Sequence, residues 1–229
     1  VNGFRFDLMG CIEKSTMKEI YKELSAIDKN VMVYGEPWTG GASGVKNGIS
    51  AGTKGSIDDC ADNTYSNNGV GCFDDDYRNA IKGAEFGGFK KGHVQGVFND
   101  GAIIKGLQGS KSDVDVIGRF INYVECHDNY TLFDKLAISH SYTTPPKAPV
   151  DLFGKIGTEG LKDVKKQDTL AAAYVFLAQG TPFINGGQEF LRTKQGDENS
   201  YNKPDEINAI NLGFKTTYSD VYDMYKGLI

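Results

Sequence analysis

The sequence predicts an α/β fold whose parallel strands form part of a (β/α)8, or TIM, barrel. Three observations support this fold class. Short apolar strands alternate with helical segments, most strands end in a polar residue, and no nucleotide-binding glycine motif follows a strand. Only about five strands are recognisable, whereas a closed barrel needs eight. We therefore expect residues 1–229 to be the later part of a barrel domain, without the first strands of that barrel.

The expected elements follow from hydrophobic spacing and from turn residues. The predicted strands span residues 3–7, 31–35, 70–73, 121–125 and 182–185. The predicted helices span residues 16–26, with Ser15 as N-cap, and residues 75–82, 164–179 and 218–229. Long glycine- or proline-rich stretches at 39–71, 87–109 and 139–160 are expected to be loops or excursions.

Composition excludes several classes of partner. The net charge is -5 and there is no basic patch, so no nucleic-acid partner is expected. No run of about 18 apolar residues suggests a membrane span, and the first residues lack the order of a signal peptide. Extracellular and cytoplasmic locations both remain open, with the extracellular one slightly favoured.

The four cysteines match no zinc pattern, and isolated thiols are the simplest interpretation. Cys60 and Cys72 form the only close pair, so a disulfide between them is the alternative.

The first strand carries a candidate nucleophile. Side chains alternate between the two faces of a strand, so Arg5 and Asp7 share one face while Phe4 and Phe6 share the other. The phenylalanines are expected to face outward toward helices, and Arg5 and Asp7 to face the barrel mouth. An arginine favours the ionised form of a nearby carboxylate and fixes its rotamer, as a nucleophile requires. A structural ion pair is the alternative.

The second strand ends at a candidate general acid. Glu36 follows the strand directly and precedes Pro37 and Trp38. An apolar surround of this kind raises the pKa of a carboxyl group, which then stays protonated and can donate a proton. An ordinary acidic loop residue is the alternative.

The fourth strand ends at Glu125 and leads into His127 and Asp128. These side chains could bind sugar hydroxyls and stabilise a positively charged transition state, although a structural pair or a metal ligand also fits. Three strand-end carboxylates at one barrel mouth suit glycoside hydrolysis. Retaining enzymes of this kind use two carboxyl groups about 5–5.5 Å apart.

Three stretches resemble signature regions of the α-amylase family (glycoside hydrolase family 13). Their residues are similar to those of its pullulanase-type debranching enzymes. They are GFRFDLMG at 3–10, YGEPW at 34–38 and YVECHDNYTL at 123–132. Three further stretches, at 73–83, 187–194 and 199–208, are similar to the same branch. The resemblance implies that Asp7 is the nucleophile, Glu36 the acid/base and Asp128 the third carboxylate. Arg5 would orient Asp7, and His127 would bind the sugar.

The resemblance also implies substrate contacts outside the carboxylates. Trp38 would line the cleft, and Asn199 and Tyr201 would lie near an α-glucan polysaccharide or oligosaccharide. The five strands would be approximately strands four to eight of the barrel. No redox cofactor is implied, and no metal ligand set is recognisable. Calcium is common in relatives.

The expected activity is retaining hydrolysis of α-1,6-glucosidic branch linkages in pullulan, starch or limit dextrins. An α-1,4-acting amylase or neopullulanase, or a non-catalytic amylase-like glucan-binding protein, is the alternative. The first signature region of the family is absent, and Asn211-Leu212 stands where the family usually has Asp-Trp. Because an incomplete barrel exposes unpaired strand edges, residues 1–229 alone are expected to be unstable or inactive.

Overall fold

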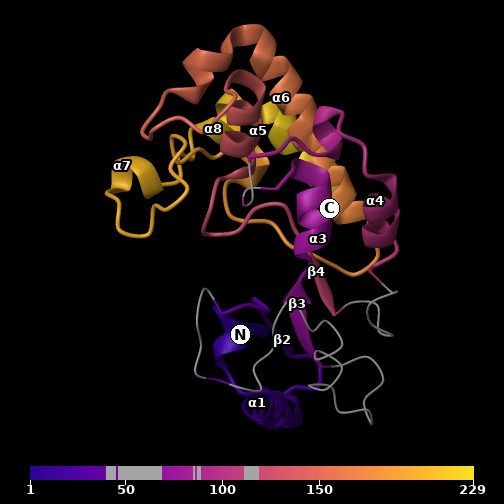
Figure 1. The fold of residues 1–229 in the computed structure, drawn as a ribbon. Coiled ribbons are helices and arrows are strands. Elements are labelled where there is room, and N and C mark those ends of the chain that lie inside the picture. The colour runs from indigo at the N-terminus through magenta and orange to yellow at the C-terminus, as the bar shows by residue number, and fades with distance from the viewer. Residues whose placement is uncertain (40–44, 46–68, 85, 87–88, 111–118) are drawn as a thin grey trace. The chain divides into compact units, whose positions relative to one another are not determined.

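The computed structural model describes residues 1–39, 45, 69–84, 86, 89–110 and 119–229 (Figure 1). Most of the predicted excursion at 39–71 lies outside this part of the chain, as does Cys60 with its candidate pairing. The chain divides into two compact units. Unit 1 comprises Val1–Asp74, Lys105–Asn122 and Gln179–Thr181, and unit 2 comprises Asp75–Ile104, Tyr123–Ala178 and Pro182–Ile229. That residues 1–229 are the C-terminal portion of one (β/α)8 catalytic domain stays a prediction.

The sheet has five strands in sequential order: β1 (Gly3–Phe6), β2 (Met32–Gly35), β3 (Val70–Phe73), β4 (Phe120–Asn122) and β5 (Thr181–Pro182). Strands β1 to β4 pair in parallel, with Phe6 opposite Gly35 and Phe73 opposite Ile121. This sequential parallel order confirms the predicted partial (β/α)8 barrel.

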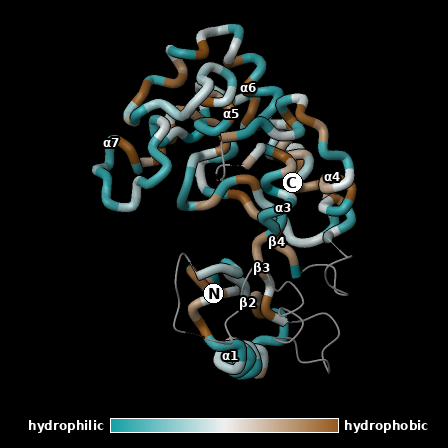
Figure 2. Tube along the Cα trace, in the orientation of Figure 1, coloured by the Kyte–Doolittle hydropathy of each residue, from teal (hydrophilic) through white to brown (hydrophobic). Residues whose placement is uncertain are grey.

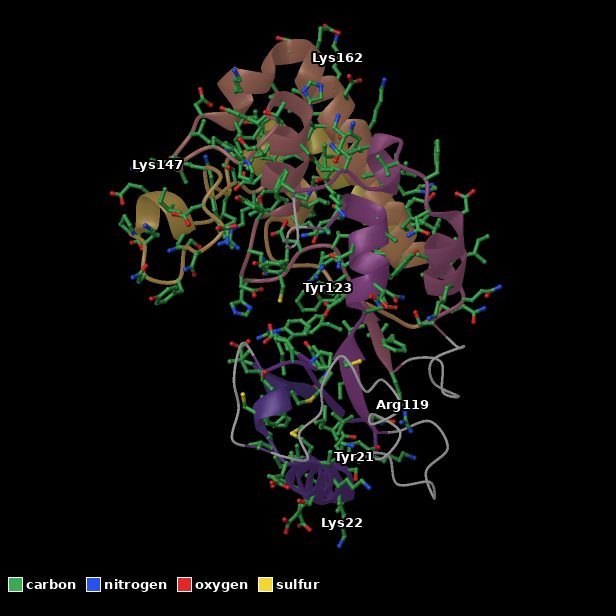
Figure 3. The ribbon with its side chains drawn as sticks, viewed as in Figure 1. Tyr21, Lys22, Arg119, Tyr123, Lys147 and Lys162 are labelled. Carbon is green, nitrogen blue, oxygen red and sulfur yellow. The ribbon has the colours of Figure 1, made fainter. Side chains whose placement is uncertain are left out.

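Helix α1 (Lys14–Ile27) buries one face against the sheet of unit 1. Tyr21 is only 4% exposed, whereas the neighbouring Lys22 points into solvent (Figure 3). Each buried apolar side chain of this size contributes about 1.5–3 kcal/mol. The buried core residues are Met9, Met17, Tyr21, Val33, Val70, Cys72 and Phe120. Phe6 packs against this core as predicted, whereas Phe4 is 40% exposed.

The predicted N-cap of α1 is wrong. The capping position is Glu13, which has an extended backbone, and Ser15 lies inside the first turn. Much of α1 has the hydrophilic colours of Figure 2, as expected for a helix that buries only one face.

Unit 2 is mainly helical. It contains α3 (Asp75–Lys82), most of α4 (Asp100–Leu107), α5 (Leu132–Ser141), α6 (Leu152–Leu177), α7 (Asp205–Asn208), α8 (Phe214–Thr217) and α9 (Ser219–Leu228). Short 3-10 turns lie at η3 (His93–Gln95) and η4 (Gln188–Phe190), and a third, η1 (Met9–Cys11), lies in unit 1. None of the helices among the described residues is long and apolar enough to cross a membrane.

Two loop predictions are wrong in part. The glycine-rich stretch at 87–109 contains α4, whose Ile103 is buried. The stretch at 139–160 contains the first two turns of α6, because Asp151 caps the helix by accepting from the Gly154 N–H at 2.9 Å. Gly157 then adopts a φ of 63° and interrupts the regular helix.

Two predicted strands are shorter than expected. Strand β4 ends at Asn122, and Tyr123 continues as irregular chain whose hydroxyl group donates to the Asp75 carboxylate at 2.5 Å (Figure 3). Strand β5 ends at Pro182 rather than at residue 185. The apolar run that predicted each strand continues into buried loop positions, which hydropathy alone does not separate from a strand.

The contact between α6 and α9 contains a buried carboxyl group. Asp168 is 0% exposed, and its Oδ1 accepts a hydrogen bond from the Tyr225 hydroxyl group at 2.9 Å. Gln188 donates to the same hydroxyl oxygen at 3.1 Å. Burial raises the pKa of Asp168 well above its usual value, and the nearby Glu125 acts in the same direction.

Replacing Gly35 by alanine should destabilise the protein. A Cβ atom there would press on the Phe6 carbonyl oxygen and lie 3.1 Å from Met9 Cβ. We expect the free energy of unfolding of the full-length protein to fall by about 2 kcal/mol in urea titrations. Gly101→Ala is the matched control, since no described atom lies within 4 Å of that position and alanine favours its helix. Equal stability of Gly35→Ala and wild type would contradict the packing.

The pKa of Asp168 predicts a pH-dependent stability. The native state holds its proton at a pH where the unfolded state, with a pKa of about 3.9, has lost it. Native stability therefore falls as pH rises above that value. Asp168→Asn removes this titration, so its stability relative to wild type should rise from pH 5 to pH 8 in urea titrations. Parallel stability curves for the two proteins would show that Asp168 is ionised in the native state.

Candidate active site

Two candidate catalytic carboxylates lie at adjacent strand ends of unit 1. Asp7 directly follows β1, and Glu36 directly follows β2. The backbone pairing continues past the strands, because the Glu36 N–H donates to the Phe6 carbonyl oxygen at 3.1 Å. A carboxylate oxygen of Asp7 and one of Glu36 lie within 4.8 Å of each other. The parallel register thus brings the predicted nucleophile and acid/base together.

The Arg5 guanidinium bridges these two carboxylates. One terminal nitrogen binds Asp7 Oδ1, and the other donates to Glu36 Oε1 at 2.6 Å. The guanidinium also lies over the Phe73 ring on β3, 5.4 Å from the ring centroid. Phe73 in turn meets Tyr34 edge to face, with ring centroids 5.7 Å apart. The cation is therefore held by both carboxylates and by an aromatic ring.

The two carboxylates differ in their exposure. Glu36 is 3% exposed, whereas the Asp7 side chain is 60% exposed. The second oxygen of Glu36 accepts from the Leu8 N–H at 2.9 Å, and Leu8 has the left-handed backbone conformation (φ 44°, ψ 48°). This main-chain donor was missed in the sequence, because no side-chain pattern indicates it.

Trp38 is half-buried, and its carbonyl oxygen accepts from the Gly10 N–H at 3.1 Å. The Glu36 carboxylate contacts two polar groups, the Arg5 guanidinium and the Leu8 N–H. An apolar surround created by Pro37 and Trp38 stays a prediction.

The third carboxylate belongs to unit 2. His127 and Asp128 are exposed on an irregular segment between β4 and α5, and Asn129 donates to Asp128 Oδ2 at 3.2 Å. Their convergence with Asp7 and Glu36 therefore stays a prediction. One ligand atom each of Cys126, His127 and Asp128 lies within 4.8 Å of the others. Consecutive residues are close in any fold, so this proximity alone does not indicate a metal site.

Below this exposed segment, Glu125 is 1% exposed. Its carboxylate accepts from the Leu132 N–H at 2.7 Å and from the Asn185 side-chain amide at 3.0 Å. Burial raises the pKa of Glu125 to about 7, although these hydrogen bonds and the charges of Lys82 and Arg192 act in the opposite direction.

Lys194 is a second buried charged residue in contact with this segment. It is 2% exposed, and its ammonium group donates to the His127 carbonyl oxygen at 3.4 Å. Burial lowers the pKa of Lys194, whereas Glu125 and Asp134 act to raise it. No sequence pattern indicates Asn185 or Lys194 as neighbours of the segment, because each contact depends on long-range packing.

Asn199 and Tyr201 lie together in unit 2 on the chain between η4 and α7. Tyr201 is 83% exposed. Both residues line an open groove of about 390 Å³. The groove is also lined by Tyr130, Pro146, Lys147, Ala148, Gly196, Asp197, Glu198, Asn202 and Lys203. Its polar surface and exposed phenol ring are suited to a sugar ring, so the groove is compatible with the predicted substrate contacts.

Known proteins are similar to this chain in sequence and in fold. No protein-family model matches the chain. The chain is 31% identical to a pullulanase of Bacillus subtilis (strain 168) over 239 residues, covering 100% of the chain and 29% of that relative. The solved structure of pullulanase from Bacillus acidopullulyticus matches it with a TM-score of 0.80 and 37% identity, covering 100% of this chain and 25% of that one. The chain is therefore a homologue of the pullulanases.

A second solved structure, a pullulanase from Anoxybacillus sp. LM18-11 complexed with maltotriose, matches with a TM-score of 0.78 at 31% identity. All of this chain and 30% of that one are covered. The chain thus spans less than a third of the length of these pullulanases. The family predicted from the signature stretches is confirmed.

The Arg5 bridge predicts a strong energetic coupling. Removing the cation in Arg5→Met leaves Glu36 as a buried charge beside Asp7, at a cost of about 3 kcal/mol in the free energy of unfolding. In a Glu36→Gln background the same substitution should cost at least about 1 kcal/mol less. Urea titrations of the four full-length proteins give this coupling energy. Additive effects would mean that the contact between Arg5 and Glu36 contributes nothing to stability.

Proposed function

We propose that the protein is a retaining glycoside hydrolase that cleaves α-1,6-glucosidic linkages in pullulan, starch or limit dextrins. The observation that carries this proposal is the pair of carboxylates at the ends of β1 and β2, with oxygens within 4.8 Å of each other. Retaining enzymes hold their carboxyl groups about 5–5.5 Å apart, and inverting enzymes about 6.5–9.5 Å apart. The short separation matches the retaining range, in which the second carboxylate attacks the anomeric carbon itself and does not hold a water molecule between itself and the sugar.

In the first step, a carboxylate oxygen of Asp7 attacks the anomeric carbon. The bond from this carbon to the glycosidic oxygen breaks, and protonated Glu36 transfers its proton to the departing oxygen. The result is a glycosyl ester on Asp7 and an ionised Glu36. Asp7 suits the nucleophile because its side chain is 60% exposed, while the buried Glu36 suits the group that must alternate between charged and neutral forms.

In the second step, Glu36 accepts a proton from a water molecule whose oxygen attacks the anomeric carbon. The ester bond breaks, Asp7 returns to its carboxylate form, and the sugar regains its original configuration after two inversions. Only bonds to oxygen form and break, so the reaction requires no electron carrier. Arg5 contacts both carboxylates and can neutralise whichever one is ionised.

The remaining predicted residues act on the sugar in this proposal. Asp128 stabilises the positive charge that develops on the ring, and His127 donates to a sugar hydroxyl. Trp38, Asn199 and Tyr201 contact neighbouring glucose units. The substrate is an α-glucan, and support for the α-1,6 linkage comes from the pullulanase names of the relatives and from the maltotriose bound to one of them.

The test is product analysis with the full-length protein on pullulan. Release of maltotriose is expected, whereas panose or maltose would show α-1,4 cleavage and overturn the linkage assignment. Asp7→Asn should lower kcat by at least about 10⁴-fold without unfolding the protein. The smaller variant Asp7→Gly should recover activity with added azide, giving a glucosyl azide of inverted configuration. The control is Asp28→Asn on the exposed end of α1, which should keep wild-type kcat.

A further inference from the structure

The segment that carries His127 and Asp128 changes from buried to exposed within three residues. Glu125 is 1% exposed, and both His127 and Asp128 are exposed. Such a short irregular segment has no ladder of backbone hydrogen bonds to fix it. The direction of its two exposed side chains therefore depends on the contacts that hold its buried end.

The Glu125 carboxylate anchors the buried end of this segment. One oxygen accepts from the N–H of Leu132, the first residue of α5, at 2.7 Å, and the other accepts from Asn185 at 3.0 Å. The segment is thereby tied both to the start of the next helix and to the chain that follows β5. Hydrogen bonds to a buried charged acceptor are stronger than those between neutral groups.

Asn185 closes a small ring of contacts. Its side-chain nitrogen donates to Glu125 Oε1 and also to the Cys126 carbonyl oxygen at 3.2 Å. An amide nitrogen has two hydrogens, and here each has an acceptor on one of two consecutive residues. Turning the amide over would place its oxygen against both acceptors. The carboxylate at position 125 therefore fixes the orientation of the Asn185 amide, and the amide in turn fixes the Cys126 carbonyl group.

A parallel contact holds the next carbonyl group. Lys194 donates to the His127 carbonyl oxygen at 3.4 Å, and its own N–H is held by Asp134 of α5 at 2.8 Å. The carbonyl groups of residues 126 and 127 thus both accept from side chains that follow β5. Together with the hydrogen bonds of Glu125, these contacts restrain the backbone that leads to Asp128.

We propose that Glu125 and Asn185 are positioning residues that fix His127 and Asp128 for contact with the sugar. The inference rests on the proposed function, because it gives Asp128 its role at the transition state. A displacement of a reacting group by about 1 Å can cost about 100-fold in rate. Loss of the hydrogen bonds made by Glu125 and Asn185 should therefore lower kcat. Substrate binding through distant glucose units should change less, so KM should stay nearly constant.

The test compares Glu125→Gln, Asn185→Asp and the double variant Glu125→Gln/Asn185→Asp in the full-length protein on pullulan. In Glu125→Gln the single amide oxygen can accept only one of the two hydrogen bonds, and Asn185→Asp places a second carboxylate against the buried one. Each single variant should lower kcat by about 10- to 100-fold. The double variant restores a donor–acceptor pair between the two positions, so its kcat should exceed that of Asn185→Asp at least about threefold.

The matched control is Ser139→Ala, which removes another buried polar side chain of unit 2, one whose hydroxyl group donates to the Lys135 carbonyl oxygen at 2.7 Å rather than to the segment. Its stability should change while kcat stays within about twofold of wild type. Wild-type kcat in Glu125→Gln, together with an inactive Asp128→Asn, would overturn the positioning role and leave the proposed function intact. Full activity of Asp128→Asn would overturn the role that the proposed function gives to Asp128, and with it the reason for positioning.

Discussion

Two carboxylates whose oxygens approach within 4.8 Å repel each other unless a positive charge lies beside both. Arg5 supplies that charge from β1, two residues before Asp7, and reaches across to Glu36 at the end of β2. Its planar fork can bind two acceptors at once, which a lysine ammonium group does with less directional control. The cation thereby links the ends of two strands in parallel register, packs over the Phe73 ring and pairs with the buried Glu36.

Unit 2 handles its charges in a different way. Glu125, Asp134 and Asp168 are almost completely removed from water, and burial raises the pKa of each. Each carboxyl group accepts hydrogen bonds that limit this penalty. Those of Glu125 and Asp134 come partly from backbone N–H groups at the start of α5 and at residues 194 and 196. Glu125 and Asp134 therefore connect irregular chain segments to α5, whereas Asp168 connects α6 to α9. An apolar side chain could not make these directional contacts.

The sequence predicted the parallel sheet because strand–helix alternation and the period-two pattern of strands are local features. It also placed Asp7 and Glu36 correctly at strand ends and Arg5 on the first strand, since one face of a short strand follows from counting residues. Helix α4 was missed because its two glycines suggested a loop, although Ile103 provides a buried anchor. Asn185 and Lys194 were missed for a different reason. Their contacts with Glu125, Cys126 and His127 join residues about 60 positions apart, and no local pattern encodes such a meeting.

The left-handed backbone of Leu8 turns its N–H toward Glu36. A leucine in this conformation costs about 1–2 kcal/mol compared with the ordinary right-handed region. The donor belongs to the main chain, so it persists with any residue at position 8 that adopts the left-handed conformation. This condition excludes proline and disfavours β-branched residues. The Leu8 side chain is 38% exposed. Position 8 is consequently a place where the surface beside the carboxylate pair can be redesigned in size and polarity while Glu36 keeps its hydrogen bond.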